Sequence, residues 1–189
     1  MADETRRVTD PKALRAMAHP LRWQLLEIVS RDGSATATQC AQETGESVAN
    51  CSYHLNLLAK YDYVEKAEGG KGREKPWRIV SQSQKFSSED ATDDDTRLAA
   101  QAATTAFLDY EFGLIRDRSL RLHLESKEWQ AVIGVDNTNE FLTPAEVEEM
   151  RVEVRRMMDR FRDRRTDPAA RPEGARSVNV FFSTMVKPD

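Results

Sequence analysis

The sequence has few of the residues from which metal centres and most active sites are built. Its 189 residues include two cysteines and three histidines, and the cysteines do not form the closely spaced pairs of many zinc and redox sites. A glycine-rich phosphate loop and an HExxH motif are also missing. We therefore expect no enzymatic activity, no bound metal and no cofactor.

Long apolar runs are missing as well. No stretch approaches the roughly 20 apolar residues that span a bilayer, and the N-terminus lacks the apolar core of a signal peptide. We therefore expect a cytoplasmic protein, and disulfides are uncommon in that compartment. Cys40 and Cys51 fall at positions expected to face a helical core, so buried free thiols are favoured over a thiol switch.

The chain has no large excess of positive charge. It carries 28 Lys and Arg against 32 Asp and Glu, a formal net charge of −4. Residues 1–80 have 12 basic and 11 acidic side chains, a net +1, and residues 81–189 have 16 and 21, a net −5. A nucleic acid would therefore be bound through a local basic patch, with an affinity that depends on salt.

What the sequence does contain is a pair of short helices joined by a tight turn, over residues 36–59. Thr36 and Gln39 have the spacing of a capping box, Gly45 falls where the first helix should end, and Ser47 can cap the second. Such a pair is typical of a helix-turn-helix, whose second helix enters the DNA major groove. The alternative is an ordinary αα-hairpin with a solvated polar face.

The second helix of this pair has an apolar stripe and a polar face. Cys51, Leu55 and Leu58 recur at intervals of four and three residues, so we expect them to be buried. Small and polar side chains on the other face suit base edges and phosphates. The residues expected to face the groove are Ser47, Ala49, Asn50, Ser52, Tyr53 and Asn56.

A β-hairpin is expected next, over residues 62–80. Apolar positions alternate on both sides of a glycine cluster, and the tip carries Lys71, Arg73 and Lys75. We expect these three side chains to hold the DNA backbone; a hairpin that charge merely keeps soluble is the alternative. A helix-turn-helix followed by a basic hairpin is the order of a winged helix, which indicates DNA binding.

These residues resemble a family of bacterial regulators. The stretches His19-Pro20-Leu21-Arg22, Glu27-Ile28, Ser52-Tyr53-His54-Leu55 and Lys71-Gly72-Arg73-Glu74 are similar to those of ArsR-type winged helix-turn-helix regulators. The similarity covers residues from about 10 to 80 and is closest to the branch without an obvious metal motif. It implies a homodimeric transcription factor, more often a repressor, that binds an inverted repeat in double-stranded promoter DNA.

The expected fold class is mainly α-helical with small β elements. We expect a winged helix-turn-helix DNA-binding domain over residues 1–80, whose first nine residues are frayed, and a polar linker over 81–96. Residues 97–189 are then a C-terminal helical and α+β region that serves dimerisation. A winged helix can also dock proteins, so a protein-interaction module without sequence-specific DNA binding is the alternative function.

A long helix is expected from about Asp94 to Ser119, because apolar residues recur at helical spacing from Leu98 to Ile115. We predict that its part around residues 97–118 packs against its copy in a second subunit. Packing against the last helix of the same chain is the alternative.

Beyond this helix the sequence predicts strands and one further helix. The β-branched run over 129–135 and the segment 140–142 are expected to form a strand pair. A helix should start at Pro144, with Thr143 as its cap. A final strand is expected over 177–185, paired with residues 131–135.

An effector pocket is a further hypothesis for this region. A plain hydrophobic core is favoured over it, since methionine and aromatic stripes at helical spacing usually pack inside. The residues expected to line a pocket for a small-molecule effector are Trp129, Phe141, Met150, Met157, Met158, Phe161 and Phe182.

Overall fold

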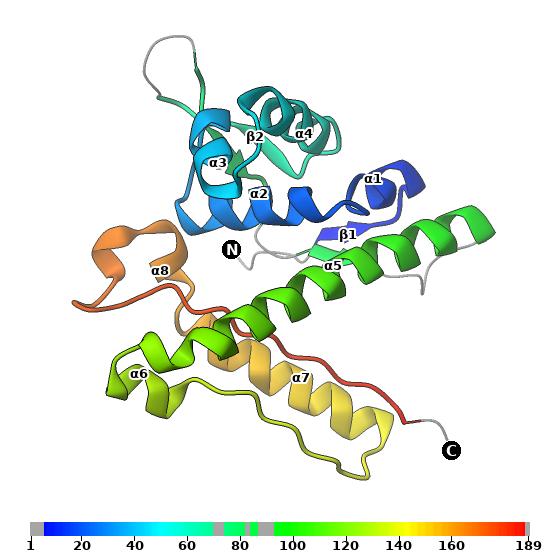
Figure 1. The fold of residues 1–189 in the computed structure, drawn as a ribbon. Coiled ribbons are helices and arrows are strands. Elements are labelled where there is room, and N and C mark those ends of the chain that lie inside the picture. The colour runs from blue at the N-terminus through cyan, green and yellow to red at the C-terminus, as the bar shows by residue number, and fades with distance from the viewer. Residues whose placement is uncertain (1–5, 70–73, 82–83, 87–92, 188–189) are drawn as a thin grey trace. The chain divides into compact units, whose positions relative to one another are not determined.

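The computed structural model describes residues 6–69, 74–81, 84–86 and 93–187 (Figure 1). Its contacts divide the chain into two units, Met1–Arg116 and Asp117–Asp189, and each is described by itself. The fold is mainly helical, with a small antiparallel sheet after the helix-turn-helix region, as the sequence predicts. The finer division into residues 1–80, 81–96 and 97–189 stays a prediction.

The helices α1 to α4 all lie in the first unit, and each starts where the sequence supplies a cap. A side chain at each start accepts a hydrogen bond from a backbone N–H of the first turn, which would otherwise lack a partner. Proline stands at the beginning of two of them, where its missing N–H costs nothing. The helices and their caps are α1 (Pro11–Ala16) with Asp10, α2 (Pro20–Arg31) with His19, α3 (Ala37–Thr44) with Thr36, and α4 (Val48–Lys60) with Ser47.

The core of this unit joins the apolar faces of these helices. Leu14 and Met17 come from the α1 segment, Leu25 from α2, and Leu55 and Leu58 from α4, and all five are fully buried. Both cysteines are also buried and free, which confirms the expectation for them. Burial raises the pKa of the Cys40 thiol to about 12, so this thiol has little nucleophilic character at neutral pH.

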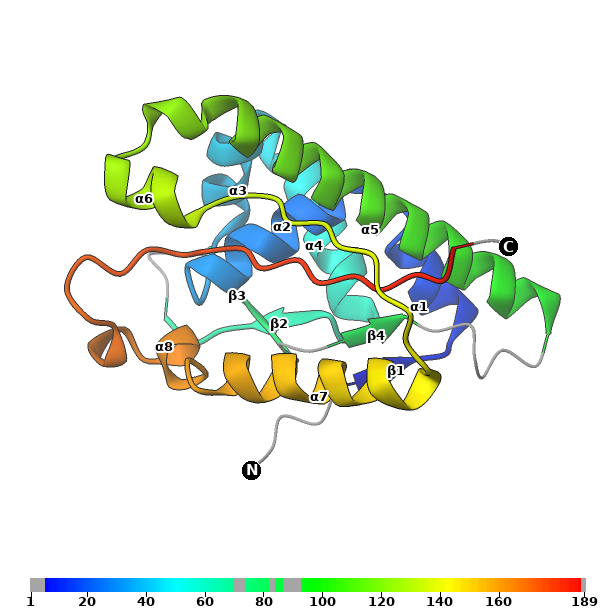
Figure 2. The same ribbon diagram turned by 90° about the horizontal axis from the view of Figure 1, so that it is seen from below.

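The predicted β-hairpin is present. Strand β2 (Val64–Lys66) pairs antiparallel with β3 (Trp77–Ile79) (Figure 2). In this register Glu65 lies opposite Arg78. Trp77 also exchanges backbone hydrogen bonds of 3.0 and 2.8 Å with Ala35, just before α3. The hairpin is therefore attached by its backbone to the helix-turn-helix.

A second, parallel strand pair was not predicted. Strand β1 (Arg6–Val8) pairs with β4 (Gln84–Phe86). The expectation that residues 1–9 are frayed is thus wrong for Arg6–Val8, because the ladder and the burial of Val8 hold this segment. Strand β4 lies within the stretch for which the sequence suggests a linker.

The long helix α5 (Asp94–Arg121) matches the prediction in position and length. Its first turns pack on the core of the first unit through small residues, which let the helix approach closely. The ring of Phe107 lies 4.8 Å from that of Trp23 on α2, measured between centroids, and the Tyr110 hydroxyl donates a hydrogen bond to Glu27. The buried residues of α5 are Thr96, Ala99, Ala100 and Ala103.

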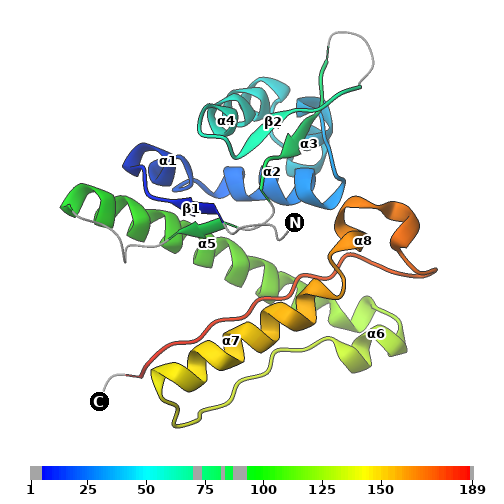
Figure 3. The same cartoon turned by 180° about the vertical axis from the view of Figure 1, so that it is seen from behind.

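The second unit contains the end of α5 and a series of shorter helices (Figure 3). The longest of them, α7, begins at the predicted residue, where Thr143 and Glu146 form a capping box with bonds of 3.3 and 2.7 Å. Among the described residues, no helix has the length and apolar character needed to cross a membrane. The elements are η1 (Leu122–Leu124), α6 (Lys127–Val132), α7 (Pro144–Asp159), α8 (Asp163–Thr166) and η2 (Pro168–Ala170).

The strands predicted for this region are wrong. Residues 127–132 form α6, because Ser126 caps a helix through the backbone N–H of Trp129 at 3.4 Å. Residues 133–143 and 175–187 contain neither helix nor strand. Since α6 takes up much of 129–135, the segment 177–185 has no predicted partner strand left to pair with.

Candidate nucleic-acid interface

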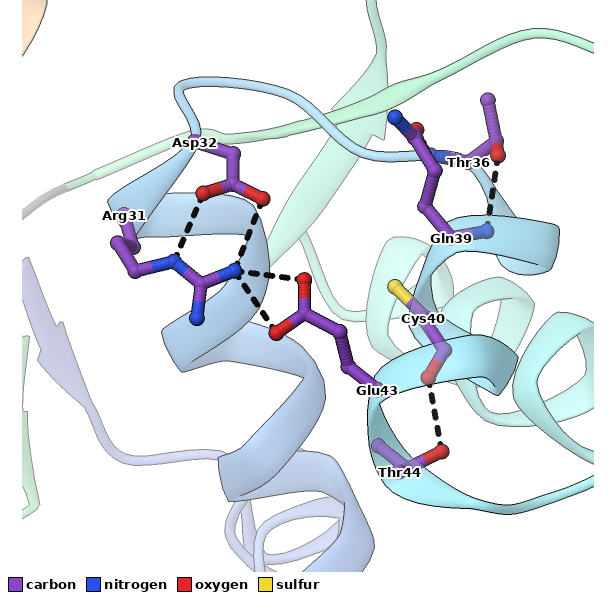
Figure 4. Close-up of polar contacts among 7 residues, drawn as sticks. All are labelled: Arg31, Asp32, Thr36, Gln39, Cys40, Glu43 and Thr44. Carbon is purple, nitrogen blue, oxygen red and sulfur yellow. Dashed lines mark hydrogen bonds and ion pairs between the residues drawn. The ribbon is translucent and has the colours of Figure 1, made fainter.

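The turn between α3 and α4 is held by local hydrogen bonds. Gly45 ends α3 with a φ of 75°, and its N–H donates to the carbonyl of Ala41 at 3.0 Å. A side chain at this position would be strained in the left-handed region. At the other end of α3, Thr36 and Gln39 form the predicted capping box. The Gln39 N–H donates to the Thr36 hydroxyl at 3.2 Å (Figure 4), and the Thr36 N–H donates to Oε1 of Gln39 at 2.8 Å.

An arginine ties α3 to the helix before it. Arg31, the last residue of α2, donates to Asp32 at 2.8 and 3.0 Å and to Glu43 on α3 at 2.6 and 2.8 Å (Figure 4). These carboxylates raise the pKa of Arg31. The pairs are exposed, so they orient α3 more than they stabilise the fold.

The two faces of α4 are as predicted from the sequence. Cys51, Leu55 and Leu58 point inward and are fully buried. Ala49, Tyr53 and Asn56 share the outward side of the helix, Asn50 and Ser52 lie on its flanks, and Ser47 is the cap that precedes it. Ser47, Ala49, Tyr53 and Asn56 are exposed, Tyr53 by 63%, whereas Asn50 and Ser52 are half-buried.

Two of these outward amides already have partners in the protein. Asn50 donates through Nδ2 to Glu46 at 2.9 Å, and Asn56 donates to the carbonyl of Ser52 at 2.7 Å. Glu46 also places a negative charge at the start of α4, where it opposes the approach of a phosphate. DNA contact by Asn50 would therefore require it to exchange the carboxylate for a base or phosphate.

Behind this face lies a cluster that sequence reasoning missed. Arg22 on α2 donates through Nε to Nδ1 of the buried His54 at 3.1 Å, and also to the carbonyl of Ala16. The rings of His19 and His54 are 4.6 Å apart. Burial lowers the pKa of His54, and the nearby charges of His19 and Arg22 lower it further. Burial and the charge of Arg22 also lower the pKa of His19. The Glu46 carboxylate acts in the opposite direction on both histidines.

Mild acid should destabilise the protein through this cluster. Both histidines have pKa values below the ordinary 6.5 in the folded state, so the unfolded chain binds more protons as pH falls below about 6.5. We expect the free energy of unfolding to fall between about pH 7 and pH 5. His54→Gln should flatten this slope and His123→Gln, at an exposed site, should not; equal slopes in urea titrations would contradict the account.

The wing is described only in part. Lys71 and Arg73 lie outside the described residues, and Lys75 is exposed. Beside it, the Glu74 carboxylate accepts hydrogen bonds from the backbone N–H of Thr38 at 3.0 Å and from its hydroxyl at 3.1 Å. These bonds lower the pKa of Glu74. The base of the wing is fixed further by Lys66, whose ammonium lies 3.4 Å from the centroid of the Trp77 ring.

Glu74 should anchor the wing to the start of α3. We expect Glu74→Ala to lower the free energy of unfolding by about 1 kcal/mol, since it removes both a cap and a charge near the helix N-terminus. Glu68→Ala, an exposed change of the same charge in the same hairpin, is the control and should have little effect. Equal midpoints for the two variants in urea unfolding would show that the anchor contributes nothing.

The residues suggested for an effector pocket all lie in the second unit. Trp129, Met150 and Met158 are half-buried there, whereas Phe141, Met157, Phe161 and Phe182 are exposed. Arg176 lies 5.1 Å from the Trp129 ring and pairs with Glu125 at 2.6 Å. The pocket itself stays a prediction. In the described parts of the chain, no group of three or more His, Cys, Asp or Glu could hold a metal ion.

The first unit is similar to a known family of protein domains. Residues 17–66 match the family model of a helix-turn-helix domain. The matched stretch runs from the end of the α1 segment through α2, α3 and α4 to β2. This helix-turn-helix domain supports a DNA-binding transcription regulator; membership of the ArsR type is finer than the match and stays a prediction. None of the curated proteins compared with the chain matches it.

Proposed function

We propose that the chain is a homodimeric transcription repressor of the ArsR type, which binds an inverted-repeat operator. The observation that carries this proposal is the division of α4. Leu55 and Leu58 fix its inner face in the core, while Tyr53 and Asn56 stand exposed on the outer face. A helix held in this way can enter the major groove without disturbing the core.

In this proposal, different residues read bases and hold phosphates. Contacts to phosphates set register, whereas contacts to base edges give specificity. The base-reading face is formed by Ser47, Ala49, Asn50, Ser52, Tyr53 and Asn56. The backbone contacts are made by Lys71, Arg73 and Lys75.

The homodimer follows from the operator symmetry that we propose. A two-fold protein places its two recognition helices on two half-sites. The outer face of α5, in the region of residues 97–118, is the proposed contact between subunits. Leu98 and Phe112 on this helix are 63% and 53% exposed, and a second copy of α5 would cover them.

A protein-interaction module is the second candidate, and Glu46 favours it. A carboxylate at the start of the recognition helix suits a basic protein surface better than a phosphate. The near-neutral charge of residues 1–80 points the same way. Retention on heparin at moderate salt would count for the DNA-binding function, and passage without retention for the module.

Selection of bound sequences from a random duplex library tests the proposed function. The full chain should enrich an inverted repeat whose half-sites lie about one helical turn apart. Enrichment of a single, unrepeated site would contradict the homodimer. No enrichment at low salt would contradict sequence-specific binding altogether.

A further inference from the structure

Positive charge is concentrated after α7, in residues 160–171, which include α8 and η2 (Figure 1). This segment contains five Arg and two Asp, whereas the rest of residues 81–189 contains 11 basic and 19 acidic side chains. A local excess of one charge attracts a partner of the opposite charge even when the whole chain is acidic. The contacts of these arginines show how far the protein itself supplies that partner.

An exposed aromatic ring brings the arginines together. Phe161 is 40% exposed, and the Cζ atoms of Arg160 and Arg164 lie 5.9 and 5.0 Å from the centroid of its ring. Cation–π contacts of this kind hold a guanidinium against an aromatic ring. Arg171 donates hydrogen bonds to the backbone carbonyls of Arg164 at 2.8 Å and Arg165 at 3.4 Å, which keeps it beside α8. We call this set the α8 patch: Arg160, Arg164, Arg165 and Arg171.

The protein does not neutralise the charges of the α8 patch. All four arginines are exposed, and in the described part of the chain no carboxylate forms an ion pair with any of them. Asp163, at the start of α8, is a single negative charge against four positive ones. Two neighbouring carboxylates have other partners: Asp159 pairs with Arg162 at 2.5 Å, and Asp167 accepts a hydrogen bond from the backbone N–H of Ala169 at 2.8 Å.

Phosphate is the anion that suits this patch. The planar guanidinium of arginine can donate two parallel hydrogen bonds to one phosphate group. The helix-turn-helix domain makes DNA the expected polyanion for this chain, yet residues 1–80 carry a net charge of only +1. Duplex DNA carries one negative charge per roughly 1.7 Å of its axis, so the α8 patch supplies cations that the first 80 residues lack.

We propose that the α8 patch binds backbone phosphates of duplex DNA. The inference rests on the proposed DNA-binding function and adds to it a contact made by the second unit. Phosphate contacts carry no sequence information. The patch therefore strengthens binding to any duplex and leaves the preference for the operator unchanged.

The salt dependence of binding tests this contact in the full chain, with a scrambled duplex of about four helical turns. The variant Arg160→Gln/Arg164→Gln/Arg165→Gln should lower the slope of log Kd against log salt by about 2–3 for each bound chain, because each phosphate contact contributes about 0.9. Arg160→Lys/Arg164→Lys/Arg165→Lys should keep the slope, since lysine keeps the charge. Fluorescence anisotropy measures Kd, and circular dichroism checks that helicity is kept.

The matched control removes three arginines of α7 that already have carboxylate partners. Arg151→Gln/Arg155→Gln/Arg156→Gln makes the same change in net charge within the same unit, and it should change the slope little. The pairs that it breaks are Arg151 and Arg155 with Glu148, at 3.9 and 2.8 Å, and Arg156 with Glu153 at 2.6 Å.

The outcomes separate this contact from the proposed function. An equal loss of slope in both glutamine variants would overturn the patch, since net charge alone would then explain the loss. An unchanged slope in the patch variant would also overturn it and leave DNA binding by the first unit standing; lost retention of that variant on immobilised poly-glutamate would then point to an acidic protein surface. No binding of the unaltered chain to any duplex at low salt would overturn both, whereas a lower slope without sequence selection would uphold the patch and reject the repressor.

Discussion

Replacing Tyr53 and Asn56 together by alanine is expected to remove most of the preference for the operator over a scrambled duplex. A good base contact discriminates by about 1–3 kcal/mol, so two such contacts amount to roughly a hundredfold or more in the ratio of dissociation constants. Both side chains are exposed, and alanine is a strong helix former, so α4 should stay folded. Binding to the scrambled duplex should change little, because phosphate contacts dominate it.

The measurement is the Kd of each variant for both duplexes at one salt concentration. Asn139→Ala, at an exposed position outside the helices of the second unit, is the control and should keep the full ratio. Equal weakening for both duplexes would mean that Tyr53 and Asn56 touch the backbone instead of reading bases. An unchanged ratio would place the recognition surface elsewhere.

Leu55→Ala is expected to lower the free energy of unfolding by about 2–5 kcal/mol. Leu55 is fully buried on the inner face of α4, so its loss removes apolar contacts and leaves a cavity. That loss is a large share of the net free energy of unfolding of a typical domain, which is roughly 5–15 kcal/mol. The DNA affinity should fall with it, because α4 is part of the core and also the proposed recognition helix.

Val48→Ala gives the comparison for this variant. Val48 is the first residue of the same helix and is 46% exposed, so its truncation should cost less than about 0.5 kcal/mol. Urea unfolding of both variants measures the difference. Equal midpoints would contradict the assignment of α4's inner face to the core.

The sequence predicted the helix-turn-helix because its signals are local. Thr36 with Gln39, Gly45 and Ser47 each determine the backbone within three or four residues of themselves. The apolar stripe of α4 likewise depends only on helical periodicity. Such features can be read without knowing what the rest of the chain does.

The features that sequence reasoning missed depend on residues far apart in the chain. Glu74 caps α3 from 36 residues away, Arg22 reaches His54 over 32 residues, and β1 pairs with β4, which lies more than 70 positions further on. No local pattern in the sequence predicts these contacts. They become visible only when the helices bring them together.

The predicted strand over 129–135 failed for a different reason. Its β-branched residues have strand propensity, but a strand also needs a neighbour, and Ser126 offers the chain a helix start instead. The cap determined the local structure because it acts within one turn. The placement of the proposed DNA contacts on α4 remains a prediction that only binding can test.

The most direct test is a fluorescence anisotropy titration of the full chain with its selected duplex and with a scrambled duplex, at two salt concentrations. The account predicts tight binding to the selected duplex alone, with two chains per site. It also predicts that high salt weakens binding to both duplexes, because both are held through phosphates. Equal affinity for the two duplexes at both salt concentrations would contradict the central claim that α4 reads DNA sequence.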